Sequence, residues 1–133
     1  MRIVALALAL ALPHQAGADT KGEEDGIVIN PLNSHDFEVI EGTNFGAAEF
    51  WCGAATFVER RRGRSELTPI YLKRKRGPSV TAPGQKGVIF TTRPDGLPAP
   101  KDRLTLTVRE PGAMLKSAQA RRYCRDAFTR STK

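Results

Sequence analysis

The stretch Asn44–Arg62, NFGAAEFWCGAATFVERRR, decides the fold of this chain. Four small or polar residues recur in it at the helical spacings of three and four: Glu49, Gly53, Thr56 and Arg60. Apolar residues occupy the other sides, so the pattern predicts a helix that is covered on more than one face. We expect Thr43 or Asn44 to cap its start, and the charges of Arg60–Arg62 to complement the negative end of its dipole.

The first eighteen residues have the three parts of a secretory signal peptide. Arg2 supplies the positive charge, Ile3–Leu12 is an apolar run of ten residues, and Ala16-Gly17-Ala18 is a small-residue cleavage site. Ten apolar residues are about half of the roughly twenty that a transmembrane helix needs, which disfavours a membrane anchor. We therefore expect cleavage after Ala18 and a periplasmic or secreted protein without a transmembrane segment.

The mature chain divides into a tail and one domain. Residues 19–34 are polar and rich in turn formers, and they predict a mobile N-terminal tail. Residues 35–133 have the length of a single domain that can fold without a metal. Removal of Arg2 lowers the formal net charge from +7 to +6, because no other charged side chain lies in the signal peptide. This charge favours an acidic protein or an anionic envelope surface as a partner.

Two cysteines, Cys52 and Cys124, remain in a chain that is expected to enter an oxidising compartment. We expect them to form one disulfide. In the chain-entropy treatment, closing a loop of this length stabilises a fold by about 4 kcal/mol. A redox function of the thioredoxin type would need a Cys-x-x-Cys motif, which the residues around Cys52 do not provide.

Four segments have the composition or the alternation of strands: Phe37–Glu41, Pro69–Lys75, Lys86–Thr92 and Asp102–Arg109. The segment Asp102–Arg109 has the clearest alternation with a period of two, which predicts that one face of this strand is exposed to solvent. A final helix is predicted from Ser117 to about Phe128, with Cys124 on its inward side. The order strand, helix, three strands, helix predicts an α+β fold with a mainly antiparallel four-stranded sheet and both helices on one face.

The candidate catalytic residues form no recognisable constellation. His14 leaves with the signal peptide, and the remaining His35 with two paired cysteines does not make an ordinary zinc site. A nucleophilic pair of Cys52 and His35 would need a thiolate, whereas Cys52 is predicted to lie mid-helix with a disulfide partner. Four glutamates offer carboxylates for glycosidase-type chemistry, but their spacing singles out no pair: Glu38, Glu41, Glu49 and Glu59. We expect no catalytic residue, no metal and no cofactor.

The basic run of Lys73, Arg74, Lys75 and Arg76 is the feature most open to a functional interpretation. At the end of a predicted strand, its side chains could hold phosphates or carboxylates. The alternative is a solvated strand end whose charges discourage aggregation through the sheet edge. Tyr71 is the only aromatic residue close by in the sequence, and secretion makes nucleic acid less available, so nucleic acid is not an expected partner.

Three segments together resemble small secreted proteins of alphaproteobacteria that have no assigned function: Phe50–Ala55, Pro69–Leu72 and Arg121–Cys124. The resemblance covers most of the mature chain and implies no catalytic or binding residues. We expect a non-enzymatic binding or envelope-associated protein. The alternatives are a small hydrolase whose site the sequence does not locate, and an inhibitor of a foreign enzyme such as a protease or lysozyme.

Overall fold

The computed structural model describes residues 26–101 and 105–131, with side chains up to Arg125. The predicted signal peptide and residues 19–25 of the predicted tail lie outside the described residues. The elements follow one another as β1 (Ile29–Pro31), β2 (Asp36–Ile40), α1 (Ala47–Thr56), the π-helix η2 (Phe57–Arg61), β3 (Pro69–Pro78), β4 (Lys86–Thr91), β5 (Met114–Lys116) and α2 (Ser117–Ser131).

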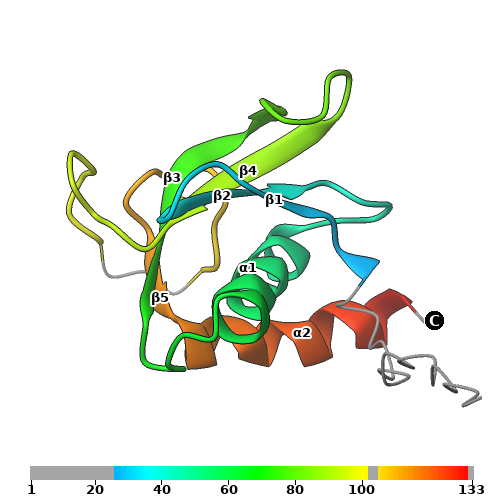
Figure 1. The fold of residues 1–133 in the computed structure, drawn as a ribbon. Helices are drawn as coiled ribbons and strands as arrows, with labels where there is room; N and C mark the ends of the chain where they lie inside the picture. Colours follow the sequence, from blue (N-terminus) through cyan, green and yellow to red (C-terminus); the bar gives the residue numbers. More distant parts are fainter. Residues whose placement is uncertain (1–25, 102–104, 132–133) are drawn as a thin grey trace, which may run out of the picture.

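The described strands form one antiparallel sheet in the order β1-β2-β4-β3-β5 (Figure 1). Figure 1 shows α1 between the sheet and α2, so both helices lie on the same side of the sheet. The predicted α+β class and the antiparallel pairing are confirmed. The predicted number of strands is wrong, because the sheet has five strands within the described residues rather than four.

The central helix is buried along both its apolar side and its polar stripe. Glu49 and Thr56 of that stripe are both buried, and Thr56 donates its hydroxyl to the Cys52 carbonyl over 2.9 Å. At Gly53, an added Cβ would lie 3.0 Å from a methyl carbon of Val39 and 3.1 Å from one of Ile27. The missing side chain therefore allows close approach of α1 to the sheet. The cap prediction is wrong, since Gly46 precedes the first turn and its N–H donates to the Glu49 carboxylate over 2.7 Å.

Aromatic rings fill the space between α1 and the sheet. The rings of Phe37 and Phe57 stack with centroids 4.4 Å apart, and Trp51 meets Phe90 edge to face at 4.9 Å. All four side chains are buried. Such pairs add roughly 0.5–1.5 kcal/mol beyond the burial of their area, so these contacts contribute to holding η2 against β2 and α1 against β4.

The folded domain begins before the boundary that the sequence predicted at residue 34. Ile29 pairs with Val39 in β1, and both Ile27 and Ile29 are buried. Two alternating isoleucines therefore complete the core, although the polar residues around them predicted a mobile tail. Arg61 donates to the carbonyl oxygen of Ile29 over 3.1 Å, which ties the edge strand to η2. Arg61 thus does more than complement a helix dipole.

The predicted strand Asp102–Arg109 is not a strand over residues 105–109, and residues 102–104 lie outside the described part of the chain. The segment lies beside β3 but bonds to it irregularly, for example through the Arg76 N–H and the Val108 carbonyl at 3.0 Å. Two register shifts also interrupt the pairing of β3 with β4 on either side of Arg74, so β3 is irregular in this region. Pairing becomes regular only in β5, after the turn at Pro111-Gly112, where Gly112 has a φ of 90°.

Candidate functional site

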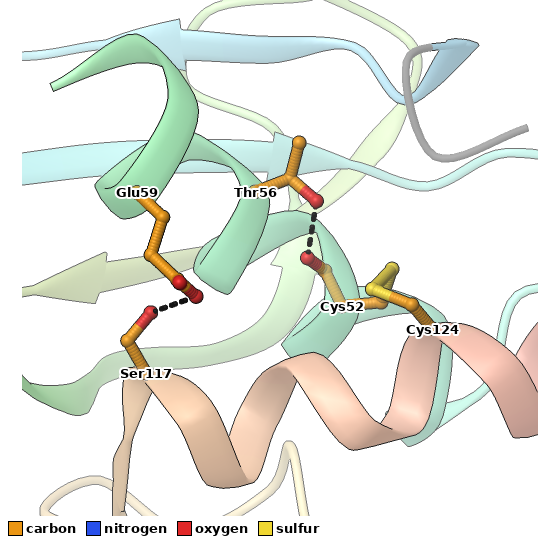
Figure 2. Close-up of a disulfide and its surroundings, with 5 residues drawn as sticks. All are labelled: Cys52, Thr56, Glu59, Ser117 and Cys124. Carbon is orange, nitrogen blue, oxygen red and sulfur yellow. Dashed lines mark hydrogen bonds between the residues drawn. A yellow bond between two sulfur atoms is a disulfide. The ribbon is translucent and has the colours of Figure 1, made fainter. Parts of the chain in front are cut away.

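The two cysteines form the predicted disulfide, which joins α1 to α2 (Figure 2). The Cα atoms of Cys52 and Cys124 are 4.7 Å apart, and Cys52 is fully buried. A bonded sulfur offers no thiolate, so the hypothesis of a Cys52–His35 nucleophilic pair is wrong for this state. His35 instead places its Nδ1 atom 3.3 Å from the Thr92 hydroxyl.

Glu59 connects η2 to the start of α2 close to the disulfide (Figure 2). The buried Ser117 hydroxyl donates to one of its carboxylate oxygens over 2.8 Å, and Arg121 donates to the other over 2.5 Å. Ser117 is the first residue of α2. The carboxylate therefore ties the first turn of α2 to η2, and its contacts are those of a structural group.

The other three candidate carboxylates have separate hydrogen-bond donors. Glu41 pairs with Arg76, and Glu49 accepts the N–H of Gly46. Glu38 accepts from the turn between β3 and β4. Each of the four predicted glutamates is therefore held by donors of the fold itself.

The Glu38 carboxylate holds the β3–β4 turn over the outer face of the sheet. It accepts from the hydroxyls of Ser79 and Thr81 and from the backbone N–H groups of Val80 and Thr81. A Cβ at Gly87 would lie 3.0 Å from the Glu38 side chain, so a glycine on β4 leaves room for the carboxylate to lie flat. The Glu38 side chain is 1% exposed and satisfied by four donors, which makes it a structural anchor.

We expect acid to weaken the fold through Glu38. Burial raises the pKa of Glu38, but the hydrogen bonds from Thr81, Ser79 and the amide of Val80 outweigh burial and hold the pKa below its ordinary value of 4.5. Because the pKa is lower in the folded chain, the stability that this group contributes is complete above about pH 4.5 and is lost as the pH falls through the folded-state pKa. Thermal unfolding followed from pH 6 to pH 3 should show a falling Tm.

The matched control for this pH dependence is Glu38→Gln. The amide keeps the shape of the side chain but does not titrate, so the variant should start with a lower Tm and lose less of it over the same pH interval. Asp36 contributes acid sensitivity in both proteins, because hydrogen bonds from Lys73, Thr91 and Asn33 outweigh burial and lower its pKa as well. Equal slopes of Tm against pH in the two proteins would contradict the assignment to Glu38.

The basic run lies on β3, and all four of its residues are exposed. Lys73 pairs with Asp36 at 2.5 Å and Arg76 pairs with Glu41. No ion pair joins Arg74 or Lys75 to another of the described residues. The structure therefore divides the run into two outer cations that have carboxylate partners and two central cations that carry uncompensated charge.

Two hollows share the residues Thr105–Thr107 in their linings. The first has a volume of about 360 Å³ and is lined by Trp51, Leu115 and Tyr123 among others. The second has a volume of about 440 Å³ and includes Arg76 and Arg109 in its lining. Arg109 was not predicted as a site residue, because the alternation of the segment Asp102–Arg109 placed its side chain on the solvent-exposed face of a strand.

Within residues 26–101 and 105–131, no cluster of three or more His, Cys, Asp or Glu side chains could hold a metal ion. None of the helices in this same part of the chain has both the length and the apolar character that a membrane crossing requires. No protein-family model, no curated protein and no solved structure matches this chain, so the resemblance to small secreted alphaproteobacterial proteins stays a prediction.

Proposed function

We propose that this is an exported, non-enzymatic binding protein that contacts an acidic protein or an anionic envelope surface through the basic run of β3. The single observation that carries the proposal is the uncompensated charge of Arg74 and Lys75 between two paired cations. The disulfide between Cys52 and Cys124 is compatible with the oxidising compartment that export requires.

The central pair is better suited to a partner than the outer pair. Lys73 and Arg76 already have carboxylates, so a partner would have to compete with Asp36 and Glu41 for them. Arg74 and Lys75 do not need to break an ion pair of the described fold. A guanidinium can also form two parallel hydrogen bonds to a carboxylate or a phosphate. We expect Arg74 and Lys75 to contribute most of the attraction and the outer pair to hold the strand in place.

The test is the variant Arg74→Ser/Lys75→Ser, measured by binding to phosphatidylcholine vesicles that contain phosphatidylglycerol. Each basic residue near an anionic membrane contributes about 1 kcal/mol, so the variant should bind roughly thirtyfold more weakly. Raising the salt concentration should weaken the wild-type protein in the same direction. Folding should survive, since exposed substitutions usually change stability by about 0.5 kcal/mol or less.

The matched control removes the same charge elsewhere, with Arg64→Ser/Lys116→Ser at two other exposed positions. A control that loses as much binding as the β3 variant would show that net charge alone matters and would contradict the proposed surface. If the wild-type protein does not bind the vesicles, capture from periplasmic extract is the second arm, and a recovered acidic protein should disappear with the β3 variant. Failure in both arms would leave the solvated strand end as the better explanation.

A further inference from the structure

The hollow of about 440 Å³ lies between the start of α1, β3 and the segment Thr105–Arg109. Its volume falls within the roughly 300–1,000 Å³ of small-molecule sites. Apolar and positively charged side chains both contribute to the lining: Phe45, Phe50, Leu106, Arg76 and Arg109. This mixture suits a ligand that has an apolar body and an anionic group.

The apolar wall is formed before any ligand binds. The rings of Phe45 and Phe50 meet edge to face, with centroids 5.4 Å apart and an interplanar angle of 86°. Phe50 is fully buried, so it holds the position of the more exposed Phe45 ring. A Cβ at Gly42 would lie 2.6 Å from the Phe45 ring, which therefore packs directly against the backbone of the preceding turn. A preformed wall lowers the cost of ordering the site when a ligand binds.

The charge of the hollow is unbalanced within the described residues. One nitrogen of Arg76 pairs with Glu41, while no ion pair joins Arg109 to a described residue. The two guanidinium groups have further N–H donors to offer, because each group has five. Apolar walls weaken the screening by water, so an anion in the hollow is attracted more strongly than one on an open surface. The N–H of Gly46 already bonds to Glu49, and the attraction rests on the two arginines.

From these contacts we infer that the hollow binds a small amphiphilic carboxylate, with its carboxylate on Arg76 and Arg109 and its apolar body against Phe45 and Phe50. The backbone N–H of Arg76 donates to the carbonyl oxygen of Val108 over 3.0 Å, and this bond keeps the neighbouring Arg109 close to the end of β3. Binding here does not depend on the proposed contact through Arg74 and Lys75. Arg76 is the member of the basic run that lines the hollow.

The experiment is an NMR titration of the folded protein with octanoate, kept below the concentration at which it forms micelles. The backbone amide resonances of Ala47, Leu106 and Arg109 should change their chemical shifts and reach saturation at the same octanoate concentration. Acetate has the charge without the apolar body, and octylammonium has the apolar body with the opposite charge. Acetate should bind at least tenfold more weakly than octanoate, and octylammonium should leave the chemical shifts of these three amides unchanged. Equal binding of either control ligand would overturn the inference.

Three variants locate the site. Arg109→Gln and Arg76→Gln should each weaken octanoate binding by about tenfold, the low end expected for losing a charge-assisted hydrogen bond. Arg109→Gln is the decisive variant because the exposed Arg109 side chain is in no ion pair of the described fold. Arg74→Ser/Lys75→Ser should leave octanoate binding unchanged, whether or not it weakens binding to vesicles. Unchanged affinity in Arg109→Gln, or a loss in the β3 variant equal to that in Arg109→Gln, would refute the assignment to the hollow.

Discussion

Replacing Trp51 with Ala should lower the free energy of unfolding by about 3–5 kcal/mol, as expected for truncation of a buried aromatic residue. Trp51 is 1% exposed and packs edge to face on Phe90 at 4.9 Å. Its indole N–H donates to the carbonyl of Thr107 over 2.8 Å, which ties the irregular segment before β5 to the central helix. A domain of this size has a total stability of about 5–15 kcal/mol, so the loss should be visible as a large shift in the denaturant midpoint.

The control Trp51→Phe separates packing from hydrogen bonding. It keeps an aromatic ring against Phe90 but leaves the Thr107 carbonyl without the indole donor, so a smaller loss of about 1–3 kcal/mol is expected. Urea unfolding followed by circular dichroism measures both variants without relying on tryptophan fluorescence. A midpoint for Trp51→Ala equal to that of the wild-type protein would show that the side chain contributes little to the core.

Removing the disulfide should have an effect of similar size. Cys52 and Cys124 are 72 residues apart in the sequence, and in the chain-entropy treatment a crosslink over that distance stabilises the folded state by about 4 kcal/mol. The variant Cys52→Ala/Cys124→Ala should therefore unfold at a much lower denaturant concentration. The contact between α1 and α2 should be affected first, since the crosslink joins these two helices.

Reduced wild-type protein is the matched control, because it loses the crosslink but keeps both side chains in the packing. It should lose nearly as much stability as the double variant.

Alkylation of the exported, unfolded and unreduced chain should add no label, and the intact mass of that chain should correspond to a protein that begins at Asp19. Two labels would mean free thiols, and a mass that includes Met1–Ala18 would contradict export by cleavage after Ala18.

The sequence alone was sufficient for the features that depend on local patterns. The period of the residues around Trp51 predicted a buried central helix, and α1 and η2 occupy that stretch. The presence of only two cysteines in a chain expected to enter an oxidising compartment led to the correct disulfide. The turn at Pro111-Gly112 is likewise a local feature, because glycine adopts the positive φ of Gly112 without strain.

Tertiary contacts alone decided the edge strands and the candidate site. β1 and β5 have three residues each, too few for a period to be visible, and they form only because β2 and β3 offer partners. Glu38 lies in the predicted strand Phe37–Glu41, but its carboxylate is covered by Ser79–Thr81, which are more than forty residues away in the sequence. Arg76 and Arg109 line one hollow although they are far apart in the sequence, because irregular bonding along β3 brings them together. Local patterns describe which residues avoid water, whereas burial of a charge and the meeting of two arginines depend on which distant segments pack against them.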